Sequence, residues 1–243
     1  MKNEKIIELL TQAVNNNDKI IVLNLIDQLK TEMLNESTKK AVGATKTSVI
    51  KKLLKDARKS VESYCYSNEK PEESPKAFML KPFKVGDYSV ITTPYRFIAS
   101  LDTIPGTAEN VQTFSNYGKF IETCKHDATV SNYCYKIPEV SELTVLYKIL
   151  KAEHKKDVYK ISVCDKVVLK AEFLIDAMNF VNTDKIYIKA ENQMVTLASD
   201  KEIAAICPIT KDRKTGNVDS IYIYIDEDGK PSIKTAPAEE KTS

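Results

Sequence analysis

The chain has 243 residues, 42% of them hydrophobic and 29% charged, a composition that is typical of a folded globular protein. Its 36 basic and 34 acidic side chains leave a net charge of +2, so the overall charge indicates no particular partner. No apolar stretch approaches the roughly 18 residues that a membrane-spanning helix needs, and the opening MKNEK does not begin a signal peptide. We therefore expect no membrane partner.

The cysteines and glycines argue against several kinds of site. The five cysteines are odd in number, and no two of them form a CxxC pair. A disulfide framework or a zinc site is therefore not indicated, and the predicted location is a reducing cytoplasm. The chain contains six glycines and neither a GxGxxG nor a GxxxxGK[ST] pattern, so no phosphate-binding loop is predicted. We expect no metal and no cofactor.

The first seventy residues have a helical pattern. Apolar side chains recur at helical spacing over residues 6–14, 18–33 and 47–64. The next segment, SNEKPEESPK (67–76), is polar and holds two prolines and three glutamates. The sequence thus predicts a helical N-terminal segment over residues 1–70, followed by a linker.

Beyond the linker, the pattern changes to strands and shorter helices. Residues 78–86 and 88–101 predict two strands joined by a glycine turn. A short helix capped by Ser115 and a longer helix opened by Pro138 follow, because proline is favoured at the first helical position.

The second half of the chain predicts more strands around one helix. Their order is a hairpin over 158–163 and 166–170, a helix over 171–181, strands over 185–191, 194–199 and 202–209, and a last strand over 220–226. We therefore predict one domain over residues 76–209 and a C-terminal hairpin with a tail over 210–243. The predicted fold class is α+β.

The run IAAICPI (203–209) is apolar without polar alternation. Such a run predicts a strand buried on both faces or the last turn of a buried helix. Because proline cannot donate to a sheet ladder, Pro208 indicates that the run ends at a sheet edge or beyond its pairing.

The segment 158–209 resembles the C-terminal domain of bacterial DNA sliding clamps, the ring-shaped β subunit of the replicative polymerase. In that family a strand leads into a helix of the form aromatic-Leu-Leu-Asp-Ala-Leu, and FLIDAM (173–178) is similar to it. The family domain closes on hydrophobic-Met-Pro-hydrophobic, and ICPI (206–209) is similar to that ending. The helix opened by Pro138 looks like a version of the domain found in phage and prophage genes of Gram-positive bacteria, and a weaker resemblance extends back to about residue 76.

The chain also departs from that family. Clamp subunits carry three such domains in sequence, whereas this chain has room for one after its helical N-terminus. It continues over residues 210–243 beyond the proline, and Cys207 stands where the family has methionine. The resemblance implies an N-terminal helical segment followed by one sliding-clamp-like domain of antiparallel strands with two helices.

The resemblance implies a non-enzymatic accessory protein of DNA replication that binds DNA, a replicative polymerase or other clamp-binding protein, or both. It also implies a homo-oligomer if the protein forms a ring. An alternative is a phage or prophage adaptor or decoy for protein–protein interaction that keeps the fold without clamping DNA. The implied peptide-binding residues are Ile206, Cys207, Pro208 and Ile209, with apolar side chains partly exposed, and the alternative for this run is an ordinary core strand.

Basic residues gather on two predicted helices. The first group lies opposite the apolar face of the helix over 47–64 and is typical of a phosphate-backbone binder. It consists of Lys51, Lys52, Lys55, Arg58 and Lys59. The second group, on the helix opened by Pro138, consists of Lys148, Lys151 and Lys155. The alternative for both groups is a solvated helix face.

No pattern predicts a catalytic group. His126 and His154 lie among charged residues, where solvent-exposed side chains are the simplest interpretation, and the cysteines lie in apolar contexts typical of inert core residues. The motif DEDG (226–229) lacks the further ligands of a calcium loop and predicts a hairpin turn. We therefore expect a protein that is not an enzyme.

Overall fold

The computed structural model describes residues 46–66, 69–109, 115–153, 160–189, 194–209 and 221–235. The chain divides into two compact units, Met1–Gly43 and Ala44–Ser243, and every described residue belongs to the second unit. The helices predicted over residues 6–14 and 18–33 therefore lie outside the described residues.

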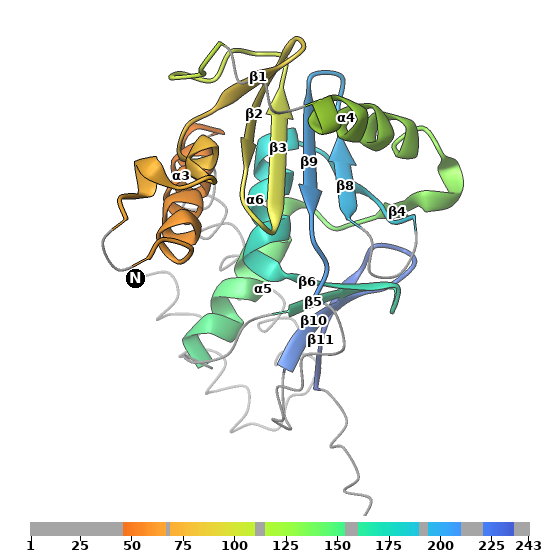
Figure 1. The fold of residues 1–243 in the computed structure, drawn as a ribbon. Coiled ribbons are helices and arrows are strands. Elements are labelled where there is room, and N and C mark those ends of the chain that lie inside the picture. Colours follow the sequence, from red (N-terminus) through yellow and green to blue (C-terminus); the bar gives the residue numbers. More distant parts are fainter. Residues whose placement is uncertain are drawn as a thin grey trace, which may run out of the picture. The chain divides into compact units, whose positions relative to one another are not determined.

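The second unit is built from two sheets and four α-helices among its described residues (Figure 1). The larger sheet has seven strands in the order β1 (Phe83–Val85), β2 (Tyr88–Thr92), β3 (Arg96–Ser100), β9 (Glu202–Ile206), β8 (Val195–Ala198), β7 (Lys185–Tyr187) and β4 (Cys134–Lys136). The smaller sheet has four, in the order β11 (Pro231–Thr235), β10 (Ile221–Ile225), β5 (Lys160–Val163) and β6 (Val167–Lys170). The helices are α3 (Lys46–Glu62), α4 (Ser115–Asp127), α5 (Val140–Glu153) and α6 (Ala171–Val181).

Strand pairing is antiparallel throughout the larger sheet, and in the smaller sheet only β10 and β5 run parallel. Short 3-10 helices over Pro71–Glu73, Ala77–Leu80 and Ser131–Tyr133 complete the unit. The predicted α+β class is confirmed.

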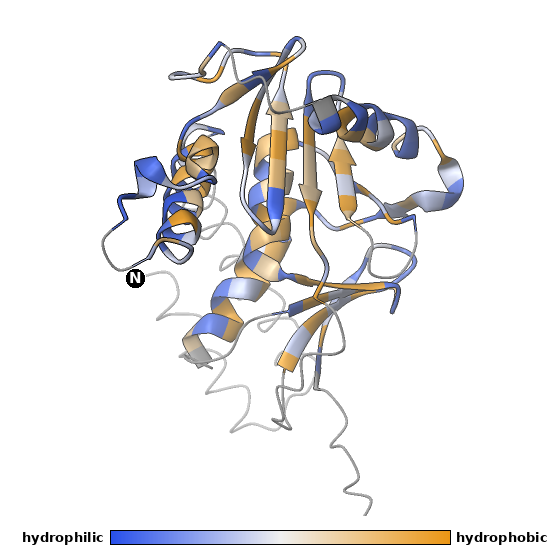
Figure 2. Ribbon diagram, viewed as in Figure 1, coloured by the Kyte–Doolittle hydropathy of each residue, from blue (hydrophilic) through white to orange (hydrophobic). Residues whose placement is uncertain are grey.

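The larger sheet lies between two helical layers, because its strands alternate between two hydrophobic cores. In β3, Ile98 packs into the core that contains α6 and parts of α3 and α5, whereas Phe97 and Ala99 pack into the core that contains α4. Figure 2 shows that β9 and α6 are mostly hydrophobic, as expected of elements with few solvent-facing positions.

Strand β9 explains the apolar run IAAICPI. Ala204 and Ile206 face the α6 side, and Ile203 and Ala205 face the α4 side. The prediction of a strand buried on both faces is therefore confirmed. Because β9 lies fourth of seven in its sheet, Pro208 does not mark an edge, and it stands beyond the last paired residue instead.

Most predicted elements of the described residues are confirmed. The helices predicted from Ser115, from Pro138 and over 171–181 correspond to α4, α5 and α6, and the strands predicted over 185–209 correspond to β7, β8 and β9. Two predictions are wrong in part. Ala77–Leu80 forms a 3-10 helix, so the first strand begins only at Phe83. The single strand predicted over 88–101 is two antiparallel strands, β2 and β3, because a turn at Pro94 reverses the chain. The glycine turn after β1 is present, with Gly86 at φ +56°.

The predicted domain boundaries are corrected by the packing. Met79, Phe78 and Leu80 pack on Ala57 and Val61 of α3, so the polar segment before them folds back on this helix and does not separate two domains. Helix α3 in turn contributes Val49 and Leu53 to the main core, which places it in the same compact unit as the sheets. The boundary predicted at residue 70 therefore does not coincide with the division of the chain, because the unit that contains α3 and both sheets begins at Ala44.

The C-terminal hairpin is also part of this unit. Its strands β10 and β11 are the ones predicted around the DEDG turn, and β10 pairs in parallel with β5, which brings Ile223 and Ile225 into the main core. None of the helices in the described part of the chain is long and apolar enough to cross a membrane.

Candidate functional site

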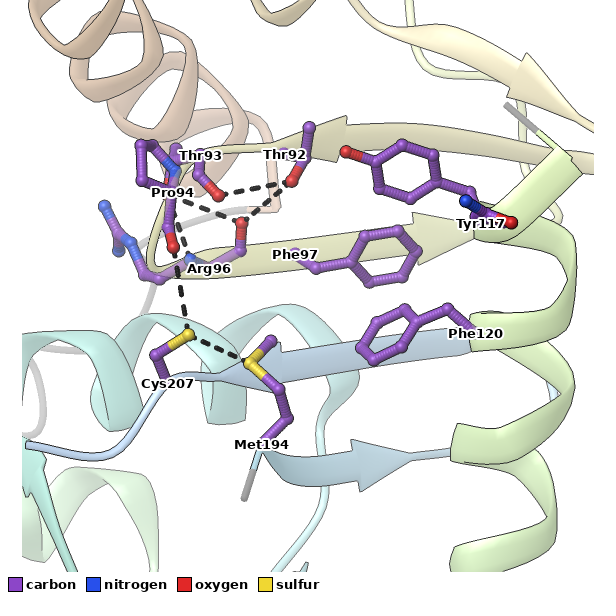
Figure 3. A pocket seen from close by; sticks show the side chains of 10 residues that line it. Thr92, Thr93, Pro94, Arg96, Phe97, Tyr117, Phe120, Met194 and Cys207 are labelled. Carbon is purple, nitrogen blue, oxygen red and sulfur yellow. Dashed lines mark hydrogen bonds between the residues drawn. The ribbon is translucent and has the colours of Figure 1, made fainter. Parts of the chain in front are cut away.

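An open cavity of about 400 Å³ lies on the α4 side of the larger sheet, where the β2–β3 hairpin ends (Figure 3). Its lining comes from four separate segments of the chain: the hairpin, α4, the start of β8 and the residue after β9. The lining residues that are apolar, aromatic or sulfur-containing are Pro94, Phe97, Tyr117, Phe120, Met194 and Cys207. We refer to this cavity as the aromatic pocket.

The hairpin turn forms one wall of the aromatic pocket. The hydroxyl of Thr93 accepts hydrogen bonds from the amides of Tyr95 at 3.2 Å and Arg96 at 3.0 Å, and the amide of Thr93 donates to the carbonyl of Arg96 at 2.8 Å. Pro94 sits at the second position, where its fixed φ suits a tight turn. The wall is therefore held by its own backbone before any ligand binds.

Three aromatic rings form the side of the pocket toward α4. Phe97 of β3 meets Phe120 edge-on at a centroid distance of 5.1 Å and stacks on Tyr117 at 6.0 Å. Tyr117 and Phe120 lie three residues apart in α4 and so face the same side of the helix. Rings in such contact have preferred geometries, so each ring restricts the orientation of its neighbours on this side of the pocket.

The remaining side holds two sulfur atoms. Cys207 Sγ lies 3.0 Å from Met194 Sδ (Figure 3). The amide of Cys207 donates to the carbonyl of Tyr95 at 2.9 Å, which extends the pairing of β9 by one residue. Burial raises the pKa of the Cys207 thiol. The thiol is therefore protonated near neutral pH and acts as an apolar surface, because the thiolate is the reactive form.

The four residues predicted to bind a peptide do not lie on one face of the sheet. Ile206 is only 1% exposed and packs on the α6 side, whereas Cys207 lines the aromatic pocket on the α4 side. The expectation that Ile206 is partly exposed is wrong, because successive residues of a strand face opposite sides of the sheet. Ile209 is half-buried, and its amide donates to the carbonyl of Val168 in β6 at 2.8 Å, so the chain crosses to the second sheet after Pro208.

Sequence reasoning did not find the aromatic side of the pocket. Tyr117 and Phe120 show a weak signal, since aromatic residues three apart in YGKF (117–120) predict one helix face. Nothing in the sequence relates that face to Phe97 or Met194, because these residues meet only through the strand order of the sheet.

Opposite the pocket, the α6 face of the sheet carries a buried ion-pair cluster. The guanidinium of Arg96, a residue that is 3% exposed, donates to the carboxylate of Asp176 in α6 at 2.7 Å and to that of Asp56 in α3. It also lies 4.1 Å from the ring centroid of Phe173. Lys52 of α3 contacts the same Asp176 at 2.8 Å. This cluster joins β3, α3 and α6.

The five basic residues predicted on α3 therefore divide into two groups. Lys52 belongs to the buried cluster, and Arg58 pairs with Glu72 at 2.8 Å. Lys51, Lys55 and Lys59 are exposed and contact no acidic side chain among the described residues. Their four-residue spacing places them in one row on the helix, opposite the buried Val49, Leu53, Ala57 and Val61.

The second basic group lies on α5. Lys148 and Lys151 are exposed, and the amine of Lys151 lies 5.7 Å from the ring centroid of Tyr147. Lys155 and His154 lie outside the described residues.

The described residues contain few groups suited to chemistry. His126 is exposed at the end of α4, and no group of three His, Cys, Asp or Glu side chains could hold a metal ion in the described part of the chain. The DEDG motif forms the β10–β11 turn, with Gly229 at φ +77°. Burial raises the pKa of Cys124 to about 11, which leaves this thiol protonated.

A second cavity of about 470 Å³ is lined by residues of one short stretch, among them Tyr64, Tyr66 and Pro75. The amine of Lys76 already covers the ring of Tyr64 at 3.1 Å from its centroid. The aromatic pocket is therefore the better candidate for a binding site.

Comparisons of the chain with models of known protein families, with curated proteins and with solved structures find no match. The resemblance of residues 158–209 to sliding clamps stays a prediction from the sequence.

Proposed function

We propose that the protein is a non-enzymatic accessory of DNA replication, similar to a sliding clamp, that binds a short apolar segment of a polymerase-type client protein. The observation that carries the proposal is the aromatic pocket next to Cys207, beside the chain segment for which the resemblance implies peptide binding. The adaptor that does not clamp DNA is the alternative, and it uses the same pocket.

The chemistry of the pocket suits side chains of an apolar peptide. Its volume of about 400 Å³ lies at the lower end of the range of ligand sites, roughly 300–1,000 Å³. Its lining is aromatic and sulfur-rich, and the polar atoms near it, such as the Thr93 hydroxyl, are engaged in the hairpin turn. An anchor residue such as leucine or phenylalanine would therefore bury apolar area against these aromatic and sulfur-containing side chains.

The test is a selection of random 12-residue peptides displayed on phage, carried out on the immobilised full chain. We expect enrichment of peptides with two or more apolar anchor residues and loss of their binding in a Met194→Lys variant, because the added charge lies at the pocket. The matched control is Leu101→Lys, which changes a residue that is 41% exposed at the opposite end of β3. Equal binding by both variants would contradict the proposal.

DNA binding is the part of the proposal that separates a clamp-like accessory from an adaptor. The observation that favours it is the row of Lys51, Lys55 and Lys59, whose amines are exposed and unpaired among the described residues. Each lysine that contacts a phosphate lowers the slope of log K against log salt by about 0.9 for duplex DNA.

The corresponding measurement is fluorescence anisotropy of a labelled 30-base-pair duplex at several salt concentrations. We expect a variant with Lys51, Lys55 and Lys59 all changed to Glu to lose binding. Each single variant is expected to reduce the magnitude of the slope of log K against log salt by about 0.9, the value of one phosphate contact. The matched control is Lys70, Lys81 and Lys166→Glu, three exposed lysines whose replacement changes the net charge equally. If both triple variants bind alike, α3 does not contact DNA and the adaptor is favoured.

A further inference from the structure

Three of the four edges of the two sheets are closed by described segments of the chain itself. At β1, the amide of Lys84 donates to the carbonyl of Ala108 at 3.2 Å. At β6, the amide of Ile209 donates to Val168 at 2.8 Å. At β4, the β10–β11 turn packs so closely that a Cβ placed on Gly229 would lie 3.1 Å from the carbonyl oxygen of Lys136.

The fourth edge is the outer side of β11, which lies beyond β10 in the smaller sheet (Figure 1). No described residue pairs with this side of the strand. Unpaired backbone groups on a regular strand are a template for pairing with another chain.

The backbone groups of β11 point alternately toward β10 and away from it. The amide of Asp226 donates to the carbonyl of Lys230 at 3.1 Å, so this pair is the hydrogen-bonded one nearest the turn. Hydrogen-bonded and non-bonded pairs alternate along an antiparallel ladder. The residues of β11 that bond to β10 are therefore Ser232 and Lys234.

Pro231, Ile233 and Thr235 thus direct their backbone groups to the free edge. Proline fits at this position, because its missing N–H is not needed by the ladder with β10. Ile225 stands opposite Pro231, and its carbonyl accepts a hydrogen bond at 2.8 Å from the amide of Cys164, just after β5. This carbonyl therefore points away from β11, as expected for a pair that is not hydrogen-bonded.

This free edge is complementary to itself. In an antiparallel pair of two copies related by a twofold axis at Ile233, the two Ile233 residues exchange both of their backbone hydrogen bonds. The N–H of each Thr235 reaches the carbonyl of Pro231 in the other copy, which requires no N–H from proline. Ser232 then stands opposite Lys234 of the other copy, so no like charges are opposed.

The side chains of β11 add an apolar contact at the same position. Ile233 is 46% exposed, although its neighbour across the strands, Ile223, is fully buried in the core. The amine of Lys234 lies 3.2 Å from the ring centroid of Tyr224 on the opposite face of the sheet, away from Ile233. A second copy would cover the exposed part of Ile233 with its own Ile233.

We propose that β11 pairs with β11 of a second copy of this chain, antiparallel and centred on Ile233, to join the two smaller sheets into one of eight strands. The contact uses the same surface on both copies, so it closes at two chains and does not build a ring. It is independent of the aromatic pocket and of α3.

The first test is the solution mass of the full chain by sedimentation velocity, from about 1 to about 500 µM, because a short strand pair gives a concentration-dependent dimer. We expect the mass to rise toward twice the 27.4 kDa of one chain. An Ile233→Pro variant removes the outward N–H and keeps the bonds of Ser232 and Lys234 to β10, so it is expected to stay monomeric. The matched control, Ile233→Val, keeps the N–H and an apolar side chain and is expected to associate.

The second test fixes the register by cross-linking under mild oxidation. An Ile233→Cys variant is expected to form a disulfide-linked dimer, since facing residues of a hydrogen-bonded pair have Cα atoms about 5.5 Å apart, within disulfide range. A Ser232→Cys variant is expected to give little dimer, because that residue stands opposite Lys234 of the other copy and too far from its own equivalent.

Four results would overturn the proposal. Three of them are a wild-type chain that stays monomeric at the highest concentration, an Ile233→Pro variant that associates as well as wild type, and equal cross-linking by both cysteine variants. A chain that associates only after removal of residues 236–243 would also overturn it, because that result would mean that the tail covers the edge.

Discussion

The two faces of the larger sheet are built from alternate residues of the same strands, yet they are filled differently. On the α6 face, Arg96 is buried, its two terminal nitrogens form ion pairs with two helices while its Nε has no hydrogen-bond partner among the described residues, and the apolar residues around it form the largest core of the unit. On the α4 face, Phe97 packs on two aromatic residues of one helix, and the aromatic pocket remains open beside it.

The difference shows how one sheet can combine a rigid support with a binding surface. The α6 face is covered by α6 and, at its sides, by α3 and α5, whereas in the described part of the chain the core of the other face receives one α-helix, α4, and Phe78 of the 3-10 helix Ala77–Leu80. On the α6 face, ion pairs join β3 to α3 and α6. On the α4 face, the side chains leave a cavity that is large enough for a ligand group. Substitutions on the α6 face are therefore expected to change the unfolding free energy more than substitutions at the aromatic pocket.

The largest contrast is expected between two neighbouring residues of the chain. Val195 is fully buried on the α6 face, and Met194 is half-buried at the pocket. A Val195→Asp variant buries a carboxylate without a partner and is expected to lose at least about 4 kcal/mol of unfolding free energy. A Met194→Asp variant keeps its charge in contact with water and is expected to lose about 1 kcal/mol.

Urea unfolding followed by circular dichroism measures both values. Similar losses in the two variants would mean that the pocket is closed in solution and that the two faces are packed alike.

A smaller contrast is expected within the buried cluster. An Arg96→Met variant leaves the buried Asp176 without its guanidinium partner and is expected to lose about 3 kcal/mol of unfolding free energy. A Lys52→Met variant removes a partner whose side chain is 39% exposed and is expected to lose less than about 1 kcal/mol. The reverse order, measured by the same unfolding experiment, would show that Lys52 holds α3 in place and that Arg96 does not.

The smallest effects are expected from added volume. A Cys207→Leu variant fills part of the aromatic pocket and is expected to gain up to about 1 kcal/mol of stability while it weakens peptide binding. An Ala204→Leu variant adds volume to the filled α6 face and is expected to lose about 1–3 kcal/mol. Thermal unfolding distinguishes the two, and a destabilised Cys207→Leu variant would indicate that no space is available at the pocket.

Local sequence patterns determined most elements of the described unit. The apolar run of β9 predicted a strand with two buried faces, Pro138 predicted the start of α5, and the alternation of SIYIYID (220–226) predicted β10. These features follow from hydrophobic periodicity and from the backbone restriction of proline, both of which act over a few residues.

Only the tertiary structure decided which of these elements meet. Arg96 bonds to Asp176, 80 positions away, and to Asp56, 40 positions away, and the period of a strand does not show which of its faces receives which helix. The same holds for Ile206 and Cys207, which the resemblance to sliding clamps implied in one peptide site and which the sheet places on opposite faces. The pocket is assembled from four segments whose proximity depends on strand order, a property of the whole chain that no local pattern encodes.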